Sequence, residues 1–590
     1  MENVFRRIKN ITGYAPSSYQ RGVLEFLLNG AGNGACNAVA GSGKSSTLLI
    51  AAIALSATGI TPDDLKVLVF GKANAEDLQG KLSKLIGRWR QCASTLHSMG
   101  FSLLKQERDR KAVKVEGQKY KQIAQDLGLL SKKDRKGSLV EEKVCSESDF
   151  LKLVDLMRLT NQVALPETVQ ALAQEHEVEL SEFHQVAEAI ADCLNLGEVL
   201  AQEEGSIDFT DMIWLPVRWH LHTRPWFRAY KYLFVDECQD LNQAQLTLAL
   251  MLAGQVEGYR GKPGRILFVG DPFQAIMGFA GADSDSYSHI VNQAKATELP
   301  LSTCYRCPTS HIALVKRLFP HIPIEPQANA PAGSIRTIEE TQLNQQLKTG
   351  DMVLSRKTAP LVKLCIQLIT RGIRATVKGR DIGDGLKREL ENIAKLPRFN
   401  FSQFGSFLNE YAKLKAEKYE GLDNCEQLIK SLADKLNALE EIYLAQVQAT
   451  SVSALAAYID DLFADNGKSP ITLATAHRSK GLENQRIFLL EPDSLPLTWK
   501  GQQDWQFQQE SNLLYVALTR STAELFLVGE PEWLPAATVT EAPALADNTE
   551  IAQSIQALCQ QLGVETVIRS ALSLSSPEEI KAIRLLVNVA

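Results

Sequence analysis

The sequence predicts an α/β protein built on parallel β-sheets, and three segments carry this prediction. The apolar run "ACNAVA" at 35–40 is followed by the turn "GSGKSS" and by the Ala- and Leu-rich stretch "TLLIAAIALSA", which is the order strand, glycine-rich turn, helix. Two further apolar runs, at 232–236 and 265–270, end in acidic residues. Because the carboxyl ends of parallel strands meet at one edge of a sheet, we expect the turn and the carboxylates to share one site.

Length and composition indicate a multidomain globular protein. The chain has 590 residues, of which 45% are hydrophobic and 22% charged. A net charge of −6 excludes a strongly basic chain, so any nucleic-acid surface would be local. The ten cysteines contain one tight pair, Cys304 and Cys307, and are interpreted as the reduced thiols of a cytoplasmic protein. The longest apolar run, 48–57, is too short to span a bilayer, so no membrane partner is expected.

The glycine-rich turn predicts a phosphate-binding loop. In the pattern G-x-x-x-x-G-K-[ST], backbone N–H groups and a helix N-terminus hold phosphates, the lysine reaches the β and γ oxygens, and the hydroxyl binds magnesium. Those roles fall to Lys44 and Ser45. The other residues expected around the nucleotide are Ala40, Gly41, Ser42, Gly43 and Ser46. Ala38 replaces the first glycine, so the strict pattern fails at one position.

The acidic strand ends predict the chemistry of the bound nucleotide. In "YLFVDECQD", Asp236 is assigned to the magnesium ion and Glu237 to the attacking water. In "DPFQ", Asp271 and Gln274 are placed to sense the γ-phosphate. Each stretch alone is equally compatible with a buried strand that has a polar cap. Together with the glycine-rich turn they predict hydrolysis of ATP with Mg²⁺.

Hydrolysis also needs arginines, because negative charge builds up on the γ-phosphoryl group in the transition state. Arg306 in "LSTCYRCP" and Arg520 in "LLYVALTRS" are candidates. Composition alone does not distinguish them from solvated surface arginines.

The order of the motifs resembles the UvrD-like branch of superfamily 1 helicases, the group of Rep, UvrD and PcrA, and "GDPFQ" is similar to the "GDPHQ" of F-box DNA helicases. The matching blocks, between about residues 14 and 530, are "SSYQ", "AGSGKSS", "VFGKANAEDL", "STLHS", "VDECQD", "VGDPFQAIMGFAGA", "CYRC", "TAHRSKGLE" and "NLLYVALTRS". The resemblance implies an α/β fold of two RecA-like P-loop lobes with parallel sheets, each carrying a mainly helical insertion subdomain.

The resemblance also implies roles at the nucleotide. Gln20 would read adenine and Tyr305 would lie against it. Arg306 and Arg520 would be arginine fingers, and Glu483 would sit near the ribose and γ-phosphate. Gln274 would couple the phosphate to the DNA groove. Ser46 stands where the family often has an arginine that stacks on the base, which puts nucleotide discrimination in doubt.

For DNA, the resemblance implies base stacking on Phe70 and Phe279, and contacts of Thr95, His97 and His477 with the backbone. Core packing of the phenylalanines and a structural role for His97 are the alternatives. Met277 and Ala280 replace an aromatic residue and an arginine of the family motif, so one stacking contact and one polar contact are in doubt.

The motif spacing predicts the domain organisation. Lobe 1A would comprise 1–100 and 206–285, with a helical insertion 1B at 101–205; lobe 2A would comprise 286–381 and 470–535, with a short helical insertion 2B at 382–469. Residues 536–590 would be a linker and tail without an assigned role. Eleven Lys and Arg against five Asp and Glu over 101–140 predict either a surface for duplex phosphates or a solvated helix face.

These observations predict an ATP-dependent DNA helicase that moves along single-stranded DNA, 3′ to 5′ by family analogy, in DNA repair or recombination. The alternatives are an ATP-driven remodeller that strips proteins from DNA and an ATP-switch subunit of a larger complex. The expected partners are single-stranded DNA and junctions of single- and double-stranded DNA, and a protein that loads the motor is left open.

Overall fold

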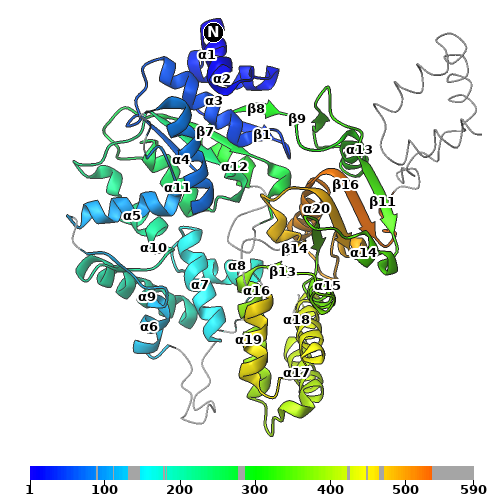
Figure 1. Cartoon of the computed structure of the whole chain (residues 1–590). Helices are drawn as coiled ribbons and strands as arrows, with labels where there is room; N and C mark the ends of the chain where they lie inside the picture. Colours follow the sequence, from blue (N-terminus) through cyan, green and yellow to red (C-terminus); the bar gives the residue numbers. More distant parts are fainter. Residues whose placement is uncertain are drawn as a thin grey trace, which may run out of the picture. The chain divides into compact units, whose positions relative to one another are not determined.

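The structure is a computed structural model, and Figure 1 shows the whole chain. It describes residues 1–87, 89, 91–109, 112–129, 146–176, 178, 180, 182–276, 286–420, 425–446, 449–463 and 471–534. Two six-stranded sheets dominate the described residues. None of the helices in these ranges combines the length and the apolar character that crossing a membrane requires.

The first sheet has the order β3-β2-β6-β7-β1-β8, and every strand pair in it is parallel. Its strands are β1 (Gly34–Ala38), β2 (Leu65–Leu68), β3 (Ala93–Ser94), β6 (Tyr232–Asp236), β7 (Arg265–Gly270) and β8 (Thr297–Leu301). Strands β1, β6 and β7 correspond to the three apolar runs in the sequence. In the register, Asn37 lies opposite Gly270 and Asp236 opposite Val269, so the three following turns emerge at one edge.

Helices cover both faces of this sheet, as a parallel sheet of apolar strands requires. One face is covered by α1 (Glu2–Thr12), α2 (Ser18–Asn29), α3 (Lys44–Ala57) and α4 (Lys72–Ile86). The other is covered by α5 (Leu96–Glu107), α10 (Asp211–Arg218), α11 (Gln243–Leu252) and α12 (Ser286–Gln293). Helix α3 is apolar nearly all round, and its residues from Thr47 to Leu55 are buried.

The first lobe extends beyond the boundary at residue 285 that the sequence predicted. Strand β8 pairs with β1 from Gly34↔Thr297 to Ala38↔Leu301 and completes the first sheet. Its sequence "TELPL" is a weak strand signal because it contains a proline. Proline is tolerated there because β8 is an edge strand.

The first insertion is helical and shares the core of its lobe. Its helices are α6 (Lys119–Asp126), α7 (Glu147–Leu159), α8 (Pro166–Glu175) and α9 (Phe183–Glu203). Their apolar side chains belong to the same hydrophobic cluster as those of α5, α10 and α11. A short parallel pair, β4 (Lys114–Val115) with β5 (Ser206–Ile207), joins the two ends of the insertion. Much of the basic block at 101–140 lies outside the described residues.

The second sheet has the order β11-β16-β15-β12-β14-β13 and is also entirely parallel. Its strands are β11 (Ser334–Ile338), β12 (Met352–Ser355), β13 (Ala375–Lys378), β14 (Ile471–Thr475), β15 (Asn484–Leu490) and β16 (Ser521–Val528). Helices α13 (Thr309–Leu318) and α20 (Asp504–Leu518) pack on one face, and α14 (Glu340–Gln346) and α15 (Ala359–Thr370) on the other. A separate parallel pair, β9 (Thr303–Cys304) with β10 (Glu325–Pro326), precedes this sheet.

The second insertion consists of α16 (Arg380–Ala394), α17 (Phe404–Tyr419), α18 (Cys425–Ala445) and α19 (Val452–Leu462). Helix α17 packs on α18 and α16 on α19, as Figure 1 shows in its yellow region. Helix α18 also packs on α15 of the second lobe. The fold class is therefore confirmed as two parallel α/β lobes with helical insertions. Residues 536–590 lie outside the described residues.

Candidate nucleotide-binding site

A cavity of about 460 Å³ lies where the turn after β1 meets the end of β6 and residues of the second lobe. It is lined by Gly41, Ser42, Gly43, Lys44, Ser45, Ser46, Leu49, Val69, Asn74, Asp77, Leu78, Lys81, Asp236, Glu237, Gln274, Arg306, Gly481 and Arg520. Most of the residues predicted to hold the triphosphate are therefore brought together in one place.

The turn between β1 and α3, called here the P-loop (residues 39–45), has the backbone of a phosphate cradle. Gly41 and Gly43 both have left-handed backbone angles, with φ of 68° and 81°. A Cβ at Gly41 would lie 2.6 Å from Cβ of Arg306, so only glycine fits there. Within the part of the chain that the structure describes, the buried Ser42 hydroxyl has no hydrogen-bond partner. Ala38 is the last, buried residue of β1, so the replaced glycine is not one of the two left-handed positions of the turn.

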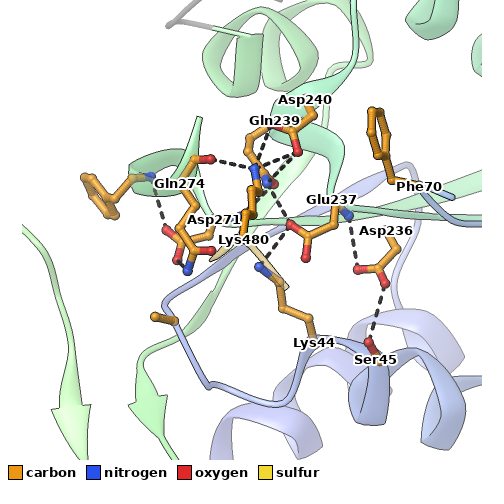
Figure 2. A network of polar contacts seen from close by, with 12 residues as sticks. Lys44, Ser45, Phe70, Asp236, Glu237, Gln239, Asp240, Asp271, Gln274 and Lys480 are labelled. Atoms are coloured by element: carbon orange, nitrogen blue, oxygen red, sulfur yellow. Dashed lines mark hydrogen bonds and ion pairs between the residues drawn. The ribbon is translucent and has the colours of Figure 1, made fainter. Parts of the chain in front are cut away.

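The two acidic residues after β6 face different parts of the P-loop (Figure 2). The carboxylate of Glu237 lies 3.1 Å from Lys44 Nζ and accepts a hydrogen bond of 2.7 Å from the side chain of Gln239. Ser45 Oγ donates to Asp236 Oδ2 at 3.5 Å. Glu237 has a left-handed backbone with φ of 49°, which is strained for a residue with a side chain and is typical of functional sites.

The electrostatics shift the pKa values of the two carboxyl groups in opposite directions. Burial, together with the adjacent Glu237, raises the pKa of Asp236 to about 7. Burial would also raise the pKa of Glu237, but the positive charges of Lys44 and Lys480 outweigh it and lower that pKa to about 2. Burial disfavours the charge of Lys44, but Glu237, Asp271 and Asp236 outweigh it and raise its pKa. Glu237 is thus ionised and Lys44 protonated at neutral pH.

The Ser45 hydroxyl and the Asp236 carboxylate fit a Mg²⁺ ion. Both are hard oxygen donors, and their close approach leaves a carboxylate oxygen whose negative charge a divalent cation would neutralise. Among the described residues, no cluster of three or more His, Cys, Asp or Glu side chains is arranged to hold a metal. Mg²⁺ commonly takes one or two protein ligands and completes its shell with phosphates and water.

A second set of polar contacts extends from Glu237 to the other lobe (Figure 2). Gln239 accepts a hydrogen bond of 2.9 Å from the N–H of Asp271, and Gln274 donates one of 2.7 Å to the Asp271 carboxylate. Lys480, which follows β14 of the second sheet, donates to Asp240 at 2.7 Å and to the carbonyl of Gln274 at 2.6 Å. The second lobe therefore contacts both acidic turns of the first.

The two predicted arginine fingers line the cavity from the second lobe. Arg306 forms an ion pair of 2.7 Å with Glu483 and donates to the carbonyl of Thr519 at 3.4 Å. Arg520 is buried and donates to the carbonyl of Val516 at 2.8 Å. Burial and the nearby Arg306 charge lower the pKa of Arg520 to about 10, which leaves it protonated at neutral pH.

Four predicted nucleotide-binding residues are outside the cavity lining. Gln20 completes a capping box with Ser17 and donates to Thr47 at 3.2 Å. The N–H of Ala40 donates to the hydroxyl of Tyr515 at 2.9 Å, so this amide is already engaged. Tyr305 is 42% exposed and contacts the P-loop through its backbone N–H. Glu483 contacts Arg306 instead, and the roles assigned to these residues stay predictions.

The predicted DNA-contacting residues that the structure describes follow the carboxyl ends of strands. Phe70 comes after β2 and is 44% exposed, and Figure 2 shows its ring outside the polar network. Thr95 caps α5 by accepting the N–H of Ser98, and burial lowers the pKa of the nearby His97. His477 follows β14, where burial and two adjacent arginines lower its pKa to about 3. Phe279, Met277 and Ala280 lie outside the described residues.

Three residues that were not assigned from the sequence stand out: Lys480 and Tyr515 contact residues of the site, and Phe209 is an exposed aromatic residue outside the cavity lining. Lys480 and Tyr515 lie in motifs that the sequence analysis recognised, but their contacts span 240 and 475 positions. No local sequence pattern can indicate a contact between residues that lie so far apart in the chain. Phe209 is 62% exposed between the buried carboxylates of Asp208 and Asp211. An aromatic residue flanked by acidic ones in "DFTD" was the available signal.

Comparison with protein families matches two helicase models to the chain. The UvrD/REP helicase N-terminal domain matches residues 26–295, and the UvrD-like helicase C-terminal domain matches residues 273–530. The two matches together cover both lobes and both insertions.

Individual relatives are distant. The chain is 25% identical over 258 residues to the ATP-dependent DNA helicase PcrA of Staphylococcus epidermidis, covering 41% of this chain and 32% of that protein. It is 25% identical over 335 residues to the F-box DNA helicase protein 1 of Schizosaccharomyces pombe (52% and 35%). It is 26% identical over 268 residues to the ATP-dependent DNA helicase Rep of Buchnera aphidicola (42% and 37%). The alignments thus span about a third of each relative. On the two domain matches and the shared motifs, the chain belongs to the UvrD-like helicase family.

Proposed function

We propose that the chain is an ATP-dependent DNA helicase that moves along single-stranded DNA from 3′ to 5′. The observation that carries the proposal is the cavity at which Lys44 and Glu237 of the first lobe meet Arg306 and Arg520 of the second. A site whose charged groups come from two lobes changes its geometry when the nucleotide is hydrolysed, which is what a motor requires.

The hydrolytic step uses groups already in place. Lys44 and the P-loop amides bind the β- and γ-phosphates, and the unpaired Ser42 hydroxyl offers a further donor. The ionised Glu237 orients the attacking water and accepts its proton. Mg²⁺, held by Ser45 and Asp236, would neutralise charge on the phosphates. Arg306 and Arg520 stabilise the charge that develops on the γ-phosphoryl group.

Coupling to DNA follows from the polar contacts between the lobes. Lys480 donates hydrogen bonds to the Asp240 carboxylate and to the backbone carbonyl of Gln274, and the Gln274 side chain donates one to the Asp271 carboxylate. A change at the γ-phosphate therefore reaches both acidic turns and the second lobe together. When the lobes approach and separate with each ATP, residues on their strand ends move relative to one another along the bound strand.

The DNA groove in this proposal lies along the carboxyl ends of the strands. Phe70 and Phe209 are exposed aromatic residues suited to stacking on bases, a contact worth about 1–3 kcal/mol per base. Thr95, His97 and His477 would contact the sugar–phosphate backbone. His477 would do so as a neutral donor, since its low pKa keeps it uncharged. The same proposal includes single-stranded DNA and junctions of single- and double-stranded DNA as partners. It also includes a loading protein and a role in DNA repair or recombination.

Steady-state ATP hydrolysis tests this function. The rate is measured without nucleic acid, with single-stranded DNA and with single-stranded RNA. We expect DNA to stimulate hydrolysis strongly. We expect Glu237→Gln to lower kcat by about 10²–10⁴-fold, because the ionised base is removed while the size of the side chain is retained.

The matched control is Glu76→Gln on the surface of α4, where the side chain is 69% exposed. It should leave kcat unchanged. Equal rates under all three conditions, no higher than those of Glu237→Gln, would contradict an autonomous motor and favour the ATP-switch subunit.

A further inference from the structure

Two buried cysteines flank the segment 305–306, which contains the proposed arginine finger Arg306. Cys304 ends β9, and Cys307 comes directly before Pro308, the N-cap of α13. Between them lie Tyr305, proposed to pack against adenine, and Arg306, proposed to reach the γ-phosphate. Both cysteines are free thiols. The nucleotide site therefore has a thiol at each end of one of its functional segments.

The two thiols are within bonding reach. The N–H of Cys307 donates to Sγ of Cys304 at 3.3 Å. Because the N–Cα bond is about 1.46 Å, Cα of Cys307 lies within about 4.8 Å of the Cys304 sulfur. Sγ of Cys307 donates to the carbonyl of Thr519 at 3.5 Å. Rotation about χ1 of Cys307 would exchange that hydrogen bond for a contact between the two sulfurs.

Cys304 has the chemical character of the attacking thiol in such a pair. The adjacent Cys307, through its thiol and its N–H, and the charge of Arg306 outweigh burial and lower the pKa of Cys304 to about 7. The same contact and burial raise the pKa of Cys307. Burial also raises the pKa of other described cysteines, namely Cys36, Cys92, Cys193, Cys238 and Cys365. The thiolate is the reactive form, so reactivity is concentrated at Cys304.

The P-loop covers the Cys304 sulfur. A Cβ added at Gly41 would lie 2.9 Å from Sγ of Cys304, and the N–H of Tyr305 donates to the carbonyl of Gly41 at 2.8 Å. These contacts join the phosphate cradle to the segment of the second lobe. Separation of the lobes would uncover the sulfur, whereas a bound nucleotide that holds them together would shield it.

We propose that Cys304 and Cys307 form an oxidisable dithiol, a modification site for small peroxides that switches the nucleotide site off. The Cys304 thiolate attacks one peroxide oxygen; the S–O bond forms, the O–O bond breaks, and the leaving hydroxide takes up a proton to become water. The Cys307 sulfur then attacks Cys304; the S–S bond forms, the S–O bond breaks, and the Cys307 proton leaves with the hydroxide as a second water. Two thiols are oxidised and one hydrogen peroxide is reduced to two waters.

The disulfide changes the site through the residues between the cysteines. It removes the contacts of Cys307 with Cys304 and with Thr519, and Thr519 also accepts a hydrogen bond from Arg306. Closing the small ring redirects the backbone that carries Tyr305 and Arg306. The effect on hydrolysis rests on the proposed function, whereas formation of the disulfide does not.

Peroxide treatment of the reduced full-length chain tests the inference. Trypsin cuts after Arg306, so a disulfide leaves the peptide ending at Arg306 linked to the one beginning at Cys307, and mass spectrometry detects the pair. We expect linked peptide, at least tenfold weaker binding of a fluorescent ATP analogue, and at least tenfold slower DNA-stimulated hydrolysis. Dithiothreitol restores all three, and prior addition of the analogue slows the linkage.

Variants separate the disulfide from general oxidation. Cys307→Ser should give a Cys304 sulfenic acid that dimedone traps, without linked peptide, and Cys425→Ser should behave as wild type. Absence of linked peptide under conditions that oxidise Cys425 would overturn the inference, as would linked peptide with unchanged analogue binding. A reduced chain that binds the analogue but never hydrolyses ATP would refute the proposed function alone.

Discussion

Asp236 and Glu237 are neighbours in the chain, yet their pKa values are shifted in opposite directions. The positive charges of Lys44 and Lys480 keep Glu237 ionised, while burial beside that negative charge raises the pKa of Asp236 to about 7. The strained left-handed backbone of Glu237 turns the two side chains toward different partners. Glu237 is thereby kept ionised beside Lys44, and Asp236 is placed beside Ser45, where a cation would bind.

The raised pKa of Asp236 predicts a pH-dependent need for magnesium. Below about pH 7 a proton occupies the carboxylate and competes with Mg²⁺, so the half-saturating Mg²⁺ concentration for hydrolysis should rise about tenfold per pH unit. Above that pH the proton is lost and the dependence should level off. Titrations at pH 6 and pH 8 measure this, with Asp236→Asn as the reference for the titration of the nucleotide itself. Equal pH dependence in both proteins would contradict the assignment.

Arg306 gives a second prediction at this scale. Its guanidinium lines the cavity with an ion pair to Glu483 as its main contact, so it is available to a γ-phosphate. We expect Arg306→Ala to lower kcat by about 10³-fold or more. Single-turnover hydrolysis measures the effect, and Arg7→Ala on the exposed face of α1 is the control. A decrease in kcat of less than tenfold would show that Arg306 does not act as an arginine finger.

At the scale of elements, helix α20 contacts the P-loop through the hydroxyl group of Tyr515. Tyr515 accepts the N–H of Ala40 at 2.9 Å in a buried position. Tyr515→Phe leaves that N–H without a partner, which costs about 1–3 kcal/mol. We expect a lower urea midpoint for the loss of ATP-analogue binding. Tyr14→Phe, at an exposed tyrosine, should not shift the midpoint.

A buried ionic cluster connects helices α6 and α7 of the first insertion to Asp208 and Asp211. Arg158 on α7 donates to Asp208 at 2.8 Å and to Asp211 at 2.9 Å, and Lys119 on α6 donates to Asp211 at 2.6 Å. Arg158→Met leaves the buried Asp208 carboxylate without its ion-pair partner and Asp211 with Lys119 alone, and should destabilise the fold by about 3–5 kcal/mol. Urea unfolding followed by circular dichroism measures this. Arg218→Met, at a half-exposed ion pair on α10, is the control, and an equal shift in both would contradict a structural role for the cluster.

How far the sequence predicts these elements depends on how local their signals are. Strand β1, the P-loop, α3 and the ends of β6 and β7 each have a short motif, and the structure places them together. Strand β8 was not recognised, because its proline-containing segment is stabilised by pairing with β1 rather than by its own pattern. The contacts of Lys480 with Asp240 and of Tyr515 with Ala40 join distant segments, so they become visible only in the folded chain.

At the scale of the whole molecule, the fold divides into two lobes that meet at the nucleotide cavity. Each lobe shares a hydrophobic core with its own insertion, so lobe and insertion form one packed body. Polar contacts cross between the lobes, from Lys480 to Asp240 and from Tyr515 to Ala40. Apolar contacts cross as well, because Val39, Ala40 and Ile276 of the first lobe belong to one buried cluster with residues of α20 in the second. The cavity is lined by residues of both lobes, so a nucleotide bound there would contact both.

Strand separation on tailed duplexes tests the central claim most directly. Fluorescently labelled duplexes with a 3′ single-stranded tail, a 5′ tail or blunt ends are incubated with the chain and ATP, and with Glu237→Gln as the inactive reference. We expect the wild-type chain to separate the 3′-tailed duplex and to leave the blunt one paired, and Glu237→Gln to separate none. Rapid DNA-stimulated hydrolysis without separation of any of the three substrates would contradict the helicase assignment.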